Sequence, residues 1–160
     1  MVNSSRSVNE VQFRFARRDD VPSIVALLAD DAIGATRETN HVTGMDGYLK
    51  AFDAMMAQGG NNYLLAVGSS DDLLGCVQIT ILPGLSRSGT NRAQLEGVRV
   101  ASTARGEGVG RLLFAEAHRI ARREGCGLVQ LTTDKARDDA YRFYESLGYV
   151  NSHHGMKLVL

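Results

Sequence analysis

The sequence predicts an α/β domain with a central mixed, mostly antiparallel sheet of about six to seven strands and about four flanking helices. Two kinds of periodicity support this class. Apolar residues alternate with a period of two in several short runs and recur at helical spacing in longer runs. The chain has 160 residues, enough to bury a core as one domain. We therefore expect a polar lead over residues 1–9 and a single domain over residues 10–160.

Glycine-rich and polar breaks separate the predicted elements. Asp19 or Asp20 can cap the first helix, whose apolar residues follow a helical spacing. In order, the elements are a strand at Val11–Phe15, a helix from Val21 that stops near Gly34, a helix at Met45–Gln58, a hairpin of strands at Tyr63–Val67 and Leu73–Leu82, a loop at Pro83–Asn91, a strand at Leu95–Val100, a long helix from Val109, a strand at Leu128–Thr132, a helix at Asp139–Leu147, and final strands at Tyr149–Val150 and Met156–Leu160.

Composition excludes several classes of function. The 18 basic and 18 acidic residues give a formal net charge of zero, so no global attraction to nucleic acid or to an anionic membrane is expected. No apolar stretch reaches the roughly 20 residues of a membrane span, and residues 1–9 lack a signal-peptide core. Cys76 and Cys126 form no metal motif. We expect both to be unpaired, buried thiols of a cytoplasmic protein without a bound metal.

The run Arg105–Arg111 is the most informative stretch, because it places glycines between a predicted strand and a long predicted helix. A helix start offers unpaired backbone N–H groups and the positive end of the helix dipole. Residues without Cβ let a phosphate approach that backbone closely. The run therefore predicts an anion-binding loop.

Two familiar phosphate loops do not fit this run. A dinucleotide fingerprint would need glycine at position 111 after Gly106 and Gly108, but Arg111 stands there. A Walker A loop needs a lysine after its last glycine, and no lysine occurs between Lys50 and Lys135. The pattern that remains, R-G-x-G-x-G after a strand ending at Val100, resembles the acyl-CoA-binding motif of the GCN5-related N-acetyltransferases (GNAT).

A second motif of this family is found later in the chain. Ala140, Tyr144, Gly148 and Tyr149 are similar to the family's A-x-x-x-Y-x-x-x-G-[FY] pattern, whose tyrosine lies beside the cofactor sulfur. The resemblance implies that Tyr144 is the general acid that protonates the leaving thiolate. Core packing is the alternative role for Tyr144, and it is the expected role of Tyr141. The two motifs span about Leu95 to Leu160, while the earlier residues match only by element order.

An acetyl acceptor amine must lose a proton, and Glu96 is the candidate general base. The resemblance places its strand against the acyl and pantetheine groups. Gly97 beside it fits a β-bulge, which would bend the strand and change its direction. Two alternatives remain open: Glu96 pairs with Arg92 or Arg99, or a water relay removes the proton.

The resemblance also implies which residues bind the cofactor. The backbone of Val98, Arg99 and Val100 would contact the pantetheine arm and the thioester oxygen. The loop backbone would hold the pyrophosphate, with guanidinium support as a second possibility at its two ends. The predicted cofactor-binding residues of the loop are Arg105, Gly106, Gly108, Val109, Gly110 and Arg111, with Tyr144 at the sulfur end.

Other polar residues receive weaker assignments. Arg137 departs from the family pattern, which often has an asparagine there, and no role is carried over to it. His118 is expected at the surface of the long helix, whereas His41, His153 and His154 are candidate substrate contacts. A weaker resemblance to aminoalkylphosphonate-type acetyltransferases is carried by Leu131–Lys135, Asp139–Tyr144 and Ser152–His153.

Together, these motifs predict direct acetyl transfer from acetyl-CoA to a primary amine of a small molecule. A protein amine is the alternative acceptor, and a homodimer is possible because members of the family are often dimers. A non-catalytic acyl-CoA sensor or partner-binding module is the alternative function, since the glycine loop alone would serve either. Tyr144 and a usable base favour the enzyme.

Overall fold

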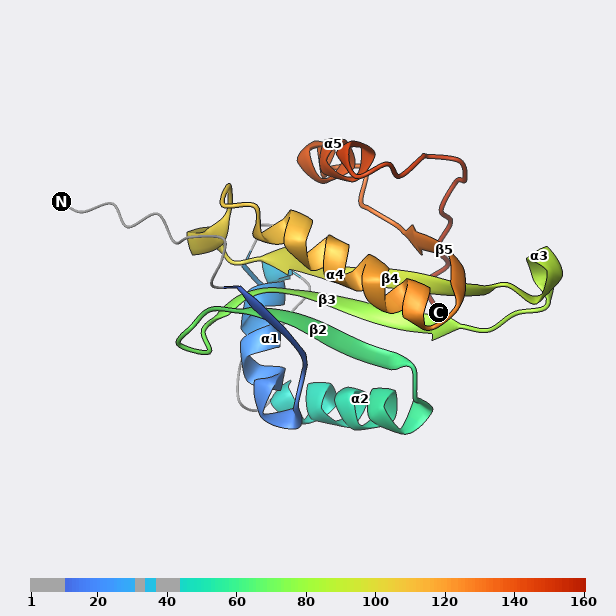
Figure 1. Cartoon of the computed structure of the whole chain (residues 1–160). Helices are drawn as coiled ribbons and strands as arrows, with labels where there is room; N and C mark the ends of the chain where they lie inside the picture. Colours follow the sequence, from blue (N-terminus) through green and yellow to red (C-terminus); the bar gives the residue numbers. More distant parts are fainter. Residues whose placement is uncertain (1–10, 31–33, 37–43) are drawn as a thin grey trace. The chain divides into compact units, whose positions relative to one another are not determined.

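A computed structural model describes residues 11–30, 34–36 and 44–160 of the chain (Figure 1). The described residues form two compact units, one up to residue 130 and one from 131 to 160, and each is described by itself. The elements are β1 (Gln12–Phe15), the 3-10 turn η2 (Arg18–Asp20), α1 (Val21–Leu28), the 3-10 turn η3 (Gly34–Thr36), α2 (Met45–Gln58), β2 (Asn61–Val67), β3 (Leu73–Leu82), α3 (Ser86–Gly89), β4 (Asn91–Val100), the 3-10 turn η5 (Ser102–Ala104), α4 (Val109–Arg123), β5 (Cys126–Leu131) and α5 (Asp138–Ser146).

The five strands form one sheet in the order β1-β2-β3-β4-β5. The first three neighbouring pairs are antiparallel. Between β4 and β5 the contacts advance in the same direction along both strands. Thr90, just before β4, lies against Gly127, and further along Gln94 accepts a hydrogen bond from Gln130. This direction indicates a parallel pair, so the sheet is mixed and mostly antiparallel, as predicted.

The strand and helix counts differ from those predicted. The described part of the chain has five strands instead of six to seven, because residues 149–150 and 156–160 form no strand. Val150 is 81% exposed, and the apolar side chains of residues 156–160 are exposed as well. Apolar composition alone does not supply the neighbouring strand that a ladder needs. The described helices number five, since a short turn within the predicted Pro83–Asn91 loop is counted as α3.

Several predicted elements are confirmed closely. The bounds of α2 and β3 agree with the prediction. The first helix is shorter than predicted, because α1 ends at Leu28 and not near Gly34. β4 begins at Asn91, four residues before the predicted start, because its first residues pair with the end of β3. In α3, Arg87 and Ser88 have left-handed backbone angles, so this segment is a tight turn between two strands and not a regular helix.

Helices cover both faces of the sheet in the first unit (Figure 1). α4 packs on one face, where a Cβ added to Gly75 of β3 would touch Leu113 and Val109 of the helix. Its amphipathic sequence buries a continuous apolar stripe. The buried residues of α4 are Val109, Leu113, Phe114, Ala117, Ile120 and Ala121.

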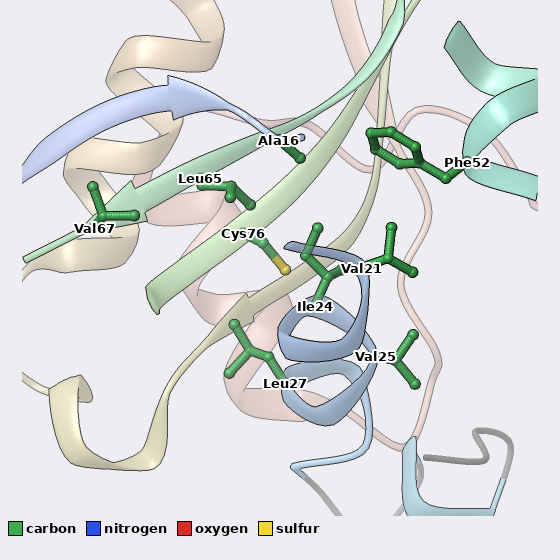
Figure 2. Close-up of a cluster of buried hydrophobic side chains, with 9 residues drawn as sticks. All are labelled: Ala16, Val21, Ile24, Val25, Leu27, Phe52, Leu65, Val67 and Cys76. Carbon is green, nitrogen blue, oxygen red and sulfur yellow. The ribbon is translucent and has the colours of Figure 1, made fainter. Parts of the chain in front are cut away.

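The opposite face carries α1 and α2 over a second apolar cluster (Figure 2). Leu65, Val67 and Cys76 contribute from the strands, and Phe52 contributes from α2. The Cys76 sulfur points toward α1 and donates a hydrogen bond to the Gly97 carbonyl at 3.7 Å. Burial raises the pKa of the Cys76 thiol to about 12, so it behaves as a small apolar side chain. Cys126 is only partly buried; both cysteines are unpaired, as predicted.

An ion pair joins β1 to the start of α1. The Arg14 guanidinium donates two hydrogen bonds to the Asp20 carboxylate, at 2.7 and 2.8 Å, and the Arg17 backbone N–H donates a third at 2.6 Å. The hydrogen bond from Arg14 is the main reason that the pKa of Asp20 is lowered. Both side chains are partly buried, so the pair is less screened than a fully exposed pair.

We expect Asp20→Asn to destabilise the protein by about 1 to 2 kcal/mol at neutral pH, because it weakens charge-assisted hydrogen bonds. A carboxyl whose folded-state pKa is depressed stabilises the fold above its unfolded value of about 3.9 and loses that contribution as pH falls further. The difference in unfolding free energy between wild type and variant should therefore shrink below pH 4 in urea titrations.

The matched control is Asp53→Asn, because Asp53 pairs with Arg18 at 3.0 Å with both side chains more than half exposed. This exposed pair should contribute little. Equal losses in the two variants, or a loss in Asp20→Asn that does not change with pH, would contradict the stabilising role of the partly buried pair.

Candidate functional site

A β-bulge interrupts the pairing of β4 with β3 at Gly97. Gln78 pairs with Glu96 and Cys76 with Arg99, so two residues of β4 lie opposite one residue of β3. Gly97 has a φ of +58°, and a Cβ there would lie 2.9 Å from the Tyr63 hydroxyl. Both the backbone conformation and the close approach require glycine. The bulge expected from the sequence is thus present.

Beyond the bulge, alternate residues of β4 turn their backbone groups away from β3. The Ala101 N–H donates to the Leu74 carbonyl of β3, so Val98 and Val100 face the other edge of β4. Their carbonyls accept hydrogen bonds from guanidinium groups: Val98 from Arg99 at 2.8 Å, and Val100 from Arg105 at 3.1 Å. β5 ends one residue after Gln130, which lies beside Gln94. Within the first unit, β4 therefore extends past its parallel neighbour.

The glycine loop follows β4 and leads into α4. Gly106 and Gly108 both have a φ of +82°, and a Cβ at either would meet no described heavy atom within 4 Å. Gly108 is the N-cap residue of α4, and no side chain caps the helix there. Left-handed glycines thus turn the backbone at the start of a 15-residue helix, beside open space. This is the arrangement of an anion site at a helix N-terminus.

Arg105 attaches this loop to the end of α1. Its guanidinium donates to the Asp30 carbonyl at 2.9 Å as well as to Val100. The Asp30 carboxylate accepts the Ser102 backbone N–H at 3.1 Å and also contacts Arg105 at 3.4 Å. The Arg105 side chain therefore holds protein groups, while Arg111, in the first turn of α4, is exposed.

Glu96 lies on the sheet face that carries α1 and α2, because it is paired with Gln78 directly across the strands. Its side chain is exposed. Neither expected arginine pair is recorded for Glu96 among the described residues. Arg99 instead donates to the Leu28 and Val98 carbonyls.

Tyr144 belongs to the second unit, on α5. Its ring packs against Phe143 and Tyr149, with centroids 5.6 and 6.1 Å away, and its carbonyl accepts the Tyr149 N–H. Burial, with a smaller contribution from Tyr144, raises the pKa of Tyr149. Tyr141 is 38% exposed, so the core-packing role expected for it is wrong. The aromatic cluster holds Tyr144 in a half-buried position within its unit.

The remaining candidates are dispersed. His118 is half-buried against Phe114 and is not a plain surface residue; burial lowers its pKa. His153 and His154 are exposed in the second unit, and Arg137 is the N-cap residue of α5. His41 lies outside the described residues. Over the described ranges, no group of three or more His, Cys, Asp or Glu side chains could hold a metal ion, and no helix is long and apolar enough to span a membrane.

The structure adds residues that the sequence did not single out. Asp30 supports the glycine loop, and the Tyr63 hydroxyl lies against the bulge. A set of amide side chains also crosses the sheet beside Glu96, beginning at Asn61. The amides carried a signal that could have been found, because each of β2, β3, β4 and β5 has at least one amide side chain beside apolar residues.

These features, a bulged strand followed by a glycine loop at a helix start, agree with comparisons to known proteins. A model of the Acetyltransferase (GNAT) family matches residues 24–149. The chain belongs to this family, and it is an acyltransferase.

Two named relatives show the relationship in more detail. The chain is 28% identical over 142 residues to the aminoalkylphosphonate N-acetyltransferase of Salmonella typhimurium, covering 89% of this chain and 86% of the other. It is 30% identical over 106 residues to a Drosophila melanogaster protein named as a probable glucosamine 6-phosphate N-acetyltransferase, covering 64% and 46%.

Solved structures share the fold. A transcriptional regulator from Bacillus halodurans C-125 superimposes with a TM-score of 0.89 at 40% identity, covering 94% of this chain and 99% of the other. An acetyltransferase from Trypanosoma brucei gives a TM-score of 0.75 at 24% identity, covering 94% and 100%.

Proposed function

We propose that the protein transfers an acetyl group from acetyl-CoA directly to a primary amine of a small molecule. The observation that carries this proposal is the sequence of three features along one stretch of chain. These are the bulge at Gly97, the outward-facing backbone of Val98 and Val100, and the glycine loop that begins α4.

The residues present fit acetyl-CoA. Its pyrophosphate matches the backbone N–H groups at the start of α4, where the left-handed glycines leave open space. Its pantetheine amides match the N–H groups of Val98 and Val100, since the carbonyls of both residues already have guanidinium partners. Acetyl-CoA supplies the activated thioester carbonyl. Arg105 orders the loop through Asp30, which is a different role from direct phosphate contact.

Two side chains of this chain would move protons. The C–N bond forms as the C–S bond breaks, so one proton leaves the amine and one is taken up by the sulfur. Glu96, exposed on the α1 and α2 face, accepts the amine proton, directly or through water. Tyr144, oriented by its aromatic cluster, donates a proton to the thiolate. Glu96 belongs to the first unit and Tyr144 to the second.

A small-molecule acceptor is favoured over a protein amine. The two relatives are named for an aminoalkylphosphonate and for glucosamine 6-phosphate, both small amines. The sequence has no extended track of one charge that would bind a peptide. Acetylation of a panel of small amines, compared with a panel of peptides, distinguishes the two classes; transfer to peptides alone would contradict this choice.

A binding function without turnover is the second candidate. It is favoured by one observation, that the 40% identical structure from Bacillus halodurans is named a transcriptional regulator. Such a protein would bind acetyl-CoA without needing a general acid. Release of free thiol in the presence of an accepted amine separates the two functions.

Acetyl-CoA at about 100 times its Kd should raise the free energy of unfolding of the protein by about 2.7 kcal/mol.

Gly108→Ala should weaken acetyl-CoA binding at least about tenfold, because it strains a left-handed position and places a methyl group where phosphate is expected. Titration calorimetry and thermal unfolding measure both effects. The matched control is Gly89→Ala, which has a φ of +76° and equally open space in the turn between β3 and β4. Equal affinities in both variants would contradict the assignment of the loop.

Tyr144→Phe should lower kcat by about 10² or more while acetyl-CoA binding is retained, because it removes only the hydroxyl that donates the proton. Steady-state kinetics and calorimetry measure the two quantities. Tyr141→Phe, one turn earlier on α5, is the control and should leave kcat unchanged. An unaltered kcat in Tyr144→Phe would remove the acid role.

Glu96→Gln should lower kcat/KM at neutral pH and remove the acidic limb of its pH dependence, because the amide cannot accept a proton. Glu124→Gln removes an exposed carboxylate that pairs with Arg123 at the end of α4, and it should have no effect. If Glu96→Gln keeps the wild-type pH profile, a water relay that does not involve this carboxylate performs the deprotonation.

A further inference from the structure

The sheet face under α1 and α2 is divided into an apolar part and a polar part. Leu65, Val67 and Cys76 line the apolar part, as Figure 2 shows. Toward β5 the same face carries five neutral polar side chains, and a sixth joins them from the end of α2; we call these six side chains the amide row. Its members are Gln58, Asn61, Gln78, Thr80, Gln94 and Gln130.

Strand register places the row on one face. Asn61 pairs with Thr80, and Thr80 pairs with Gln94, so the three side chains project from the same side of the sheet. Gln130 of β5 joins them by donating to the Gln94 side chain at 2.7 Å. The row thus crosses β2, β3, β4 and β5 in sequence.

The β2 end of the row is closed. Asn61 and Thr80 are only 8% and 7% exposed. The Asn61 oxygen accepts hydrogen bonds from Gln78 at 2.9 Å and Thr80 at 3.1 Å, and its nitrogen donates to Gln58 at 2.9 Å. Burying these groups is tolerated because they are paired.

The β4 end of the row is open. The Gln94 side-chain oxygen accepts a hydrogen bond from Gln130, and the Gln78 side-chain nitrogen donates one to Asn61. Among the described residues, no partner is recorded for the Gln94 nitrogen, the Gln78 oxygen or the Gln130 oxygen. Every described side-chain N or O atom that is sealed from solvent has a partner, so these three atoms are reachable by solvent. They offer one donor group and two acceptors on the same face of the sheet.

The open end lies beside the proposed base. Glu96 is directly opposite Gln78 and two residues from Gln94, so all three project from the same face. A molecule bound to the amides would hold an amino group near the carboxylate. The row itself carries no charge, and its free atoms both donate and accept, which suits hydroxyl groups better than a phosphate.

We propose that the amide row is the acceptor subsite and that it selects amines carrying neutral hydroxyl groups, such as amino alcohols and amino sugars. This inference rests on the proposed acetyl transfer. Gln94 and Gln78 bind the hydroxyl groups of the acceptor and orient its amine toward Glu96. They are specificity-determining residues, and they do not take part in the proton transfers. Asn61 holds the Gln78 side chain, and Gln130 holds the Gln94 side chain.

The test compares matched amines on the full-length protein. Wild type should acetylate glucosamine with a kcat/KM at least about tenfold above that for cyclohexylamine, and 2-aminoethanol should exceed propylamine in the same way. Gln94→Met and Gln78→Met keep the side-chain length but remove its hydrogen bonds. Each should reduce these ratios by about tenfold while leaving KM for acetyl-CoA unchanged.

The matched control is Gln12→Met on β1, an exposed glutamine at the far edge of the same sheet. It should leave the ratios at their wild-type values. Thermal unfolding of all three variants excludes loss of folding as the cause of a change.

Failure of this inference can be distinguished from failure of acetyl transfer. Equal kcat/KM for hydroxylated and apolar amines, or ratios unchanged in both row variants, would overturn the subsite although the enzyme is active. A higher kcat/KM for 2-aminoethylphosphonate than for 2-aminoethanol, with the same ratio in Gln94→Met, would overturn the proposed selection of neutral hydroxyl groups. If no amine is acetylated, titration calorimetry of glucosamine with wild type and with Gln94→Met tests the subsite by binding alone. Glucosamine binding that is lost in Gln94→Met supports the subsite, and equal or absent binding in both proteins overturns it.

Discussion

One extra residue in β4 determines much of the surrounding structure. Because Gly97 and Val98 together lie opposite a single residue of β3, the strand bends where the Tyr63 hydroxyl packs against it. Residues before the bulge supply Glu96 and Gln94 to one face of the sheet. Residues after it turn the backbone of Val98 and Val100 to the outer edge. A regular strand would change which face each later residue occupies, since side chains alternate with a period of two.

The glycine loop depends on the same strand, because it begins where β4 ends. Its anchor is polar: Arg105 connects the Val100 carbonyl to Asp30 at the end of α1, and Asp30 also accepts the Ser102 N–H. The proposed cofactor half therefore depends on the connection between α1 and the end of β4. The two halves of the proposed site use β4 on opposite sides of the bulge: side chains before it and backbone groups after it.

Much of the fold follows from the sequence, but the site follows only in part. The apolar periodicity was sufficient to predict the bounds of α2 and β3. The glycine run predicted the loop before α4, and Gly97 predicted the bulge. The strands expected at Tyr149–Val150 and Met156–Leu160 are absent from the described chain, because apolar composition does not supply a pairing partner. Asp30 could not be predicted as a support of the loop, since it contacts residues more than 70 positions away.

The guanidinium groups on the outer edge of β4 also bear on solubility. A strand that extends past its neighbour exposes half-filled ladder positions, which are a template for pairing with another chain. Arg99 and Arg105 occupy the carbonyls of Val98 and Val100, so an incoming strand would find acceptors already bound and two positive charges beside them. The edge is thereby less able to pair with a strand of another chain.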